Sequence, residues 1–93
     1  MLKLDPSTKF KKDLKKIKKQ NKEIEKLNGV IETLQKEEPL DKKYKDHDLV
    51  GNWKGYRECH ITPDWLLIYK VCGDDVRLLR LARTGSHSEL LKK

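Results

Sequence analysis

The sequence has few cysteines and no long apolar run. Only Cys59 and Cys72 occur among 93 residues, too few for the disulfide framework that holds many small secreted domains together. No apolar run approaches the roughly 18 residues of a membrane-spanning helix, and no apolar signal-peptide segment follows Met1. These absences predict a cytoplasmic protein that does not enter the membrane and whose two thiols stay reduced.

The chain is also too short for a second domain. Its 93 residues predict a single domain spanning residues 1–93. A chain of this length buries roughly 60–65% of its unfolded surface, so the core is small. Disorder is the alternative for a chain with 40% charged residues, but apolar side chains alternate too densely over residues 49–82 to favour it. We therefore expect any active site to be a shallow groove on a sheet.

Positive charge is in excess, and it is concentrated near the beginning of the chain. The formal net charge is +7, and nine lysines lie between Lys3 and Lys22 against only two acids. One interpretation is a solvated helix face. The other, which we favour because a mixed-sign face suffices for solubility, is attraction to a polyanion, either nucleic acid or an acidic protein.

Apolar spacing in the first part of the chain predicts a short strand followed by two helices. Leu2 and Leu4 alternate with a lysine, as in a strand. Asp5-Pro6-Ser7 then favours a helix start, because Ser or Asp caps a helix and Pro fits its first position. A second helix is predicted from about Asn21 to Gln35, and Pro39 ends the helical region.

The spacing changes to period two in the second half. Residues 40–52 form a predicted irregular basic loop, and a short last helix or tail capped by Ser86 or Ser88 follows Gly85. Turn sequences separate three predicted strands: 53–61, 65–71 and 76–82. Helices segregated from such a meander define the α+β class: an antiparallel sheet with two N-terminal helices packed on one side.

The three histidines are candidate acid–base groups. Metal-independent RNA cleavage needs a base that takes the 2′-hydroxyl proton and an acid that protonates the leaving 5′-oxygen. Histidine suits both because its unperturbed pKa of about 6.5 lies near working pH. His47, His60 and His87 are far apart in the sequence, so the residues alone equally allow three unrelated surface histidines.

Other polar and aromatic residues leave alternatives open. Cys59-His60 lacks partners at zinc-binding spacing, so we expect neither a metal nor another cofactor. Asp64 suits a solvated turn, although it could also orient His60. Trp65 is interpreted either as a core residue or as a platform on which an RNA base stacks. Tyr56 and Tyr69 are expected in the core, because both fall inside predicted strands.

A longer pattern resembles a known family. Residues 45–71, KDHDLVGNWKGYRECHITPDWLLIYKV, and residues 83–91, RTGSHSELL, closely resemble the YafQ branch of the RelE-like toxins. These are ribosome-associated messenger-RNA endonucleases paired with an antitoxin. The resemblance is collinear over nearly the whole chain. The chain departs from the family pattern at Leu91, where the family often has Phe. This departure matters because a branched aliphatic side chain packs but does not stack on a base.

The resemblance implies a type II toxin that cleaves mRNA on the translating ribosome and is restrained by an acidic antitoxin. His87 is then the expected general acid, and His60 or His47 the base, with Asp64 assisting. Cleavage would leave a 2′,3′-cyclic or 3′-phosphate and a 5′-hydroxyl. The alternative is a non-catalytic RNA- or ribosome-binding module of the same fold. The expected RNA-binding residues are Trp65, Arg83, Lys54, Arg57 and Leu91.

Overall fold

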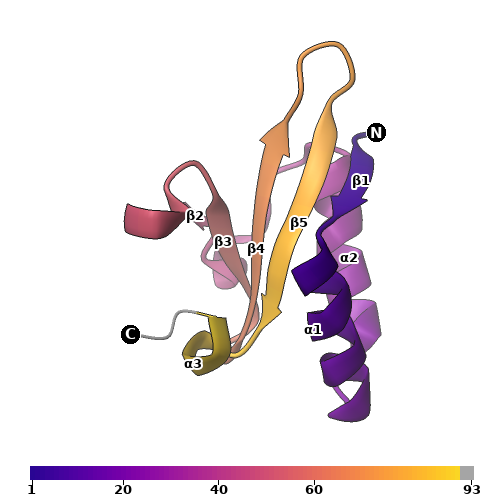
Figure 1. Ribbon diagram of the computed structural model, residues 1–93, viewed down its shortest axis with the longest axis vertical. Helices are drawn as coiled ribbons and strands as arrows, with labels where there is room; N and C mark the ends of the chain where they lie inside the picture. Colours follow the sequence, from indigo (N-terminus) through magenta and orange to yellow (C-terminus); the bar gives the residue numbers. More distant parts are fainter. Residues whose placement is uncertain (91–93) are drawn as a thin grey trace.

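The computed structural model describes residues 1–90 and has a five-stranded sheet at its centre (Figure 1). The strand order is β1-β5-β4-β3-β2. The strands are β1 (Lys3–Pro6), β2 (His47–Asp48), β3 (Arg57–Thr62), β4 (Trp65–Cys72) and β5 (Leu78–Gly85). The helices are α1 (Thr8–Lys19), α2 (Ile24–Gln35) and α3 (His87–Leu90), with short 3₁₀ helices η1 (Lys42–Tyr44) and η2 (Gly51–Trp53).

The α+β class predicted from the sequence is confirmed. Helices α1 and α2 lie together on one face of the sheet, and α3 lies on the other side (Figure 1). One pairing differs from a purely antiparallel sheet, because β1 runs parallel to β5. Parallel neighbours need a long connection, which here is almost the entire chain. The β3–β4 and β4–β5 pairings are antiparallel, as expected, and β2 adds an antiparallel pairing with β3 that was not predicted.

Backbone conformation accounts for the elements that begin later than predicted. The second helix starts at Ile24 rather than near Asn21, because Asn21 has a left-handed φ of 57°. The strand predicted at 53–61 begins only at Arg57, after η2 and Gly55 with its φ of 95°. The predicted loop at 40–52 contains η1, β2 and η2. Left-handed residues interrupt regular hydrogen bonding, and period alone does not reveal them.

Helix caps tie the ends of the chain to the sheet. The Ser7 hydroxyl accepts from the backbone N–H of Phe10 at 3.0 Å and donates to the carbonyl of Ala82 in β5 at 2.7 Å. At α3, the hydroxyl of Ser86 accepts from the Glu89 N–H, and the Glu89 carboxylate accepts from the Ser86 N–H. This reciprocal pair is a capping box, and it confirms Ser86 as the cap.

The main core fills the space between the sheet and the two long helices. It contains Phe10 and Ile17 of α1, Leu27 of α2, and Leu67 and Tyr69 of β4. Tyr69 is therefore a core residue, as predicted. Cys59 is buried in the same layer and Cys72 is half-buried; both thiols are free, as expected. In residues 1–90, no helix is both long enough and apolar enough to span a bilayer.

A second, smaller cluster lies on the opposite face. Leu66, Ile68 and Ala82 pack there against Leu90 of α3, with half-buried Leu49, Trp53 and Tyr56 around them. Tyr56 thus belongs to this cluster and precedes β3 instead of lying within a strand. We call this side the open face, and define it by Glu58, His60, Leu66, Ile68 and Ala82. Within residues 1–90, the segments that pack on this cluster are α3 and the chain around η2, and His60 stays partly exposed.

Candidate active site on the open face

Two histidines meet on one buried carboxylate. The β2–β3 register pairs His47 with Glu58, and His60 follows Glu58 on the same side of β3, because alternate strand residues share a face. His47 Nε2 lies 3.4 Å and His60 Nε2 3.6 Å from the same Glu58 Oε1. The two imidazole centroids are 6.3 Å apart. The fold therefore brings together two of the three predicted histidines.

Glu58 is an unusual residue for this position. It is only 3% exposed, and its Oε2 has no hydrogen-bond partner within residues 1–90. A buried carboxylate is costly unless it is paired with a positive charge or hydrogen-bonded. The groups that lie beside this carboxylate are the imidazoles of His47 and His60.

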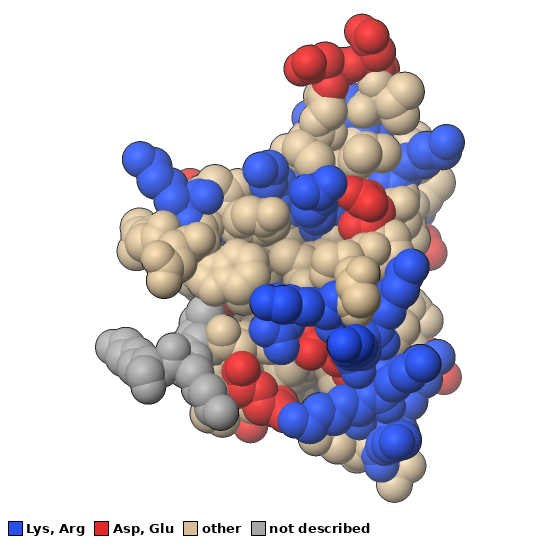
Figure 2. Space-filling view, viewed as in Figure 1, with Lys and Arg blue, Asp and Glu red and all other residues tan. Residues whose placement is uncertain are grey.

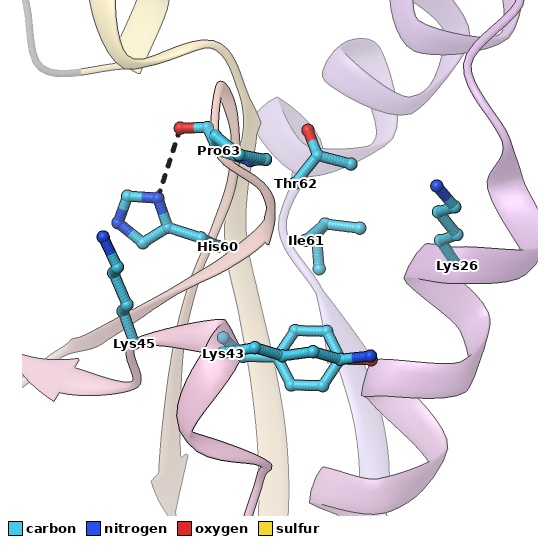
Figure 3. Close-up of a pocket in the computed structure, with 8 residues that line it drawn as sticks. Lys26, Lys43, Lys45, His60, Ile61, Thr62 and Pro63 are labelled. Carbon is cyan, nitrogen blue, oxygen red and sulfur yellow. Dashed lines mark hydrogen bonds between the residues drawn. The ribbon is translucent and has the colours of Figure 1, made fainter.

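Hydrogen bonding defines how the His47 ring is held. Its Nδ1 lies 2.6 Å from the backbone carbonyl of Lys45, and a carbonyl only accepts. Nδ1 therefore carries the proton, and Nε2 can donate to Glu58 only when the ring is doubly protonated. His60 is held more loosely, with Nδ1 3.4 Å from the carbonyl of Pro63 (Figure 3).

The third histidine is carried to the same face by α3. Leu90 packs on Leu66 and Ile68, which are paired with His60 and Glu58 across the β3–β4 ladder. Gly85 is paired with Leu66 on its other side, so two strand spacings, about 10 Å, separate its backbone from that of His60. His87 follows two residues later and is exposed.

An ion pair with α1 fixes α3 in place. The Lys16 ammonium contacts the Glu89 carboxylate, and this contact, together with the Ser86 N–H, lowers the pKa of Glu89 to about 2. Because Glu89 is two residues from His87, the pair restrains the turn that carries the histidine.

Arg83 is engaged by a carboxylate of α1. Its Nε and Nη2 donate to the two oxygens of Asp13 at 2.7 and 3.0 Å, and Asp13 also accepts from the Thr84 N–H at 3.2 Å. The Asp13 hydrogen bonds raise the pKa of Arg83. The predicted contact between Arg83 and an RNA phosphate stays a prediction, and it has to compete with this pairing.

Arg57 was also predicted to bind RNA, and that contact stays a prediction, because two carboxylates engage its guanidinium. Its Nη1 donates to Asp48 at 2.7 Å, and its Nε and Nη2 lie 3.3 and 3.2 Å from the Asp46 carboxylate. The pKa of Arg57 is raised, chiefly by the hydrogen bond with Asp46. Asp46 and Asp48 flank His47, so Arg57 holds the segment that presents this histidine instead of offering a free cation to phosphate.

For Trp65, burial corrects the prediction of a stacking platform to that of a core residue. It is 2% exposed, and its indole N–H donates to the Thr84 hydroxyl at 2.9 Å. A ring enclosed in this way has no free face for a base. The half-buried aromatic rings on the open face are Trp53 and Tyr56, which contact each other edge to face with centroids 5.3 Å apart.

The remaining predicted residues lie at the surface. Asp64 is exposed in the turn between β3 and β4, and nothing in the described chain joins it to His60, whose acidic neighbour is Glu58. Lys54 is exposed directly after η2. Leu91 lies outside the described residues. Glu58 was missed at the sequence level, although the alternation of Glu58 and His60 in one strand would have placed them on one face.

Residues 1–90 contain no group of three His, Cys, Asp or Glu side chains arranged to hold a metal ion. The lysines of the first helix gather on one side of the molecule, and Figure 2 shows them as an almost continuous blue surface over α1. On the open face, His47, His60 and Glu58 are the neighbouring groups that can take part in acid–base chemistry.

Comparison with solved structures shows which class of protein has this fold. A metal-bound toxin from Helicobacter pylori is 47% identical, with a TM-score of 0.89 and coverage of 97% of this chain and 99% of that one. A chain of the Escherichia coli DinJ–YafQ toxin–antitoxin complex is 43% identical, with a TM-score of 0.84 and coverage of 96% of both chains. The fold is that of the RelE-like bacterial toxins.

The family model of YafQ, the bacterial toxin of type II toxin–antitoxin systems, matches residues 2–92. The chain belongs to the YafQ toxin family. Among curated relatives, the mRNA interferase toxin YafQ of E. coli strain K12 is 56% identical over 52 residues, which are 56% of this chain and 53% of that protein. The aligned segment thus spans about half the length of that relative.

Proposed function

We propose that this protein is an endoribonuclease toxin that cleaves mRNA and is restrained by a cognate antitoxin. The observation that carries the proposal is the contact of His47 and His60 with the single buried carboxylate of Glu58 on an open, partly basic face. The name of the E. coli relative, an mRNA interferase toxin, supports the same activity.

The proposed chemistry uses the three histidines as proton donors and acceptors. His60 or His47, oriented by Glu58, takes the proton of the RNA 2′-hydroxyl, whose oxygen then attacks the adjacent phosphorus. His87 gives a proton to the departing 5′-oxygen. The P–O5′ bond breaks as the P–O2′ bond forms, which leaves a 2′,3′-cyclic phosphate and a 5′-hydroxyl. Glu58 takes the assisting role that the sequence suggested for Asp64.

Substrate contacts are proposed for side chains that are accessible on this face. Trp53 is half-buried and presents an aromatic surface, and Lys54 follows it as an exposed cation. Base–aromatic stacking contributes roughly 1–3 kcal/mol per base. A ribosome that displays a single codon would bring the mRNA to this face.

The antitoxin is proposed to be an acidic protein. The excess of positive charge and the lysine surface over α1 suit an acidic chain that covers them, and a YafQ chain from E. coli forms such a toxin–antitoxin complex with DinJ. Its association should slow steeply with added salt, because exposed charges are screened within about 8 Å at physiological ionic strength.

The decisive experiment measures cleavage of a defined mRNA by the purified protein, with and without ribosomes. Glu58→Gln, His60→Gln and His87→Gln should each lower the cleavage rate by about 10²–10⁴-fold, the contribution typical of a positioned acid or base. Glu25→Gln is the matched control, since Glu25 is an exposed carboxylate of α2 and should leave the rate unchanged.

Three results would contradict the proposal. Cleavage at the control rate in all three variants would remove the histidines and Glu58 from the chemistry. Binding of RNA or ribosomes without any cleavage would instead support a non-catalytic module. Because a related toxin binds metal, the assay is repeated with a chelator, and loss of cleavage that Mg²⁺, Zn²⁺ or Cu²⁺ restores would replace the metal-independent scheme.

A further inference from the structure

A cavity of about 590 Å³ lies at the edge of the sheet beside the histidine pair. It forms because β2 pairs only with Arg57 and Glu58, so in the described chain the edge of β3 that faces away from β4 is unpaired beyond Glu58. Helix α2 and η1 enclose the space from the other sides (Figure 3). Its polar and aromatic lining comes from Lys26, Lys43, Tyr44, Lys45 and His60.

The charge of this cavity is of one sign. Two of its lysines, Lys43 and Lys45, belong to the segment of η1 and the third, Lys26, to α2, and none of the lining residues in the described structure is acidic. The ammonium of Lys43 lies 5.2 Å from the centroid of the Tyr44 ring, and that of Lys26 lies 3.6 Å from Glu23 in an exposed ion pair. Surface pairs of this kind contribute little, so the three cations favour an anion in the cavity.

Two residues connect the cavity to the proposed active site. Lys45 lines the cavity with its side chain, while its carbonyl is the acceptor for His47 Nδ1. His60 lines the cavity with its ring, while its Nε2 faces Glu58. Figure 3 shows the Lys45 side chain extending toward the His60 imidazole at one end of the cavity. An anion bound here would thus lie next to the reacting groups.

The size and the aromatic wall indicate more than a lone ion. Ligand pockets typically measure about 300–1,000 Å³, so this cavity has room for one nucleotide. Tyr44 is half-buried, and its ring offers a surface against which a base or ribose can pack.

We propose that this cavity binds the nucleotide next to the cleaved bond, with its phosphate held by Lys43, Lys45 and Lys26 and its base or sugar against Tyr44. The inference rests on the proposed function, because it assigns a second contact point to the same RNA strand. The strand would run from the open face, past His60, over the free edge of β3 and toward α2.

The test uses a short single-stranded RNA with 2′-O-methyl groups, which binds without being cleaved. The double variant Lys43→Gln/Lys45→Gln should weaken binding at least tenfold. It should also make the dependence of log Kd on log salt shallower by about 0.7 for each phosphate that the variant no longer neutralises. The control, Lys36→Gln/Arg77→Gln, also removes two positive charges, but from exposed residues outside the cavity. It should bind RNA within about twofold of wild type.

A backbone NMR titration locates the ligand. Amide shifts of His60, Ile61 and Thr62 should move on addition of the oligonucleotide. Inorganic phosphate should move the same amides only at much higher concentration. Equal affinity for inorganic phosphate would overturn the assignment to RNA, and so would equal weakening by the cavity and control variants.

Melting temperatures within a few degrees of wild type keep the comparison valid, and the single variant Lys43→Gln replaces the double one if Lys45 proves necessary for folding. The readout is independent of cleavage. Cavity-specific weakening of binding in a protein that cuts no RNA would support the subsite while refuting the endoribonuclease proposal. Cleavage without cavity-specific weakening would do the reverse.

Discussion

Among the charged side chains, Asp13 is expected to make one of the largest contributions to the stability of the folded protein. Its carboxylate accepts three hydrogen bonds from β5: two from the Arg83 guanidinium and one from the Thr84 N–H. Asp13→Ala removes all three. The side chains of Asp13 and Arg83 are 13% and 22% exposed, so the substitution leaves a mostly buried guanidinium and a backbone donor without partners.

The magnitude follows from that burial. Removing one partner of a fully buried pair costs about 3–5 kcal/mol, whereas an exposed pair contributes about 0–1 kcal/mol. The intermediate burial of Arg83 places the expected loss of stability at about 2–4 kcal/mol, and the higher helix propensity of Ala offsets only about 0.5 kcal/mol. For a domain of this size the melting temperature should fall by about 8–30 °C.

Thermal unfolding followed by circular dichroism measures this destabilisation, with Asp5→Ala as the matched control. The carboxylate of Asp5 also pairs with an arginine of β5, Arg80. The side chains of Asp5 and Arg80 are, however, 37% and 44% exposed. The melting temperature of the control should therefore fall much less. If Asp13→Ala melts no lower than Asp5→Ala, the reasoning from burial is refuted. If Asp13→Ala binds RNA more tightly than wild type while still folded, Arg83 is a phosphate ligand that Asp13 occupies.

Three further predictions concern single side chains. Glu89→Gln should lower the melting temperature at pH 7 and lose its effect as the pH falls from about 4.5 to 2, because the pKa of Glu89 in the folded protein, about 2, lies below its ordinary value and the ion pair is lost on protonation. A difference from wild type that persists at pH 2 would exclude this ion pair as the cause. Burial raises the pKa of Cys59 to about 12, so a thiol reagent at pH 8 should modify half-exposed Cys72 quickly and Cys59 only after denaturation; two fast thiols would contradict its burial. Trp65→Phe should reduce stability by at least the roughly 0.5–1.5 kcal/mol of its indole hydrogen bond and leave the KM for RNA unchanged, whereas a raised KM at unchanged stability would restore it as a stacking residue.

Local order along the chain was predictable from the sequence, because it depends on residues close to one another. The spacing of Phe10 and Ile17 predicts the first helix, and the side chains are buried as expected. The sequence offered Ser86 and Ser88 as caps of the last helix, and the structure selects Ser86. The element boundaries were less predictable, since a left-handed residue such as Asn21 changes no apolar period.

The resemblance to the YafQ toxins identified His47, His60 and His87 as one set, and family membership follows for the whole chain. Because these histidines are far apart in the sequence, their relative positions could not be predicted from it. The fold determines these positions for two of them, because a ladder between β2 and β3 brings His47 and His60 to one carboxylate oxygen. Glu58 was not predicted as a site residue, because nothing in the sequence distinguishes one acidic residue from the many other charged residues.

What only the tertiary structure decided is which charges and rings remain available. Arg83 and Asp13 are 70 positions apart, and Trp65 and Thr84 are 19 apart, so no local pattern links them. In the folded protein, Arg83 is paired with a carboxylate, and the Trp65 ring, whose residue type suits stacking, is buried. Composition and period determine a basic α+β domain, but the pairing of distant residues determines what its surface presents to RNA, because burial and salt bridges depend on contacts that the chain makes only when folded.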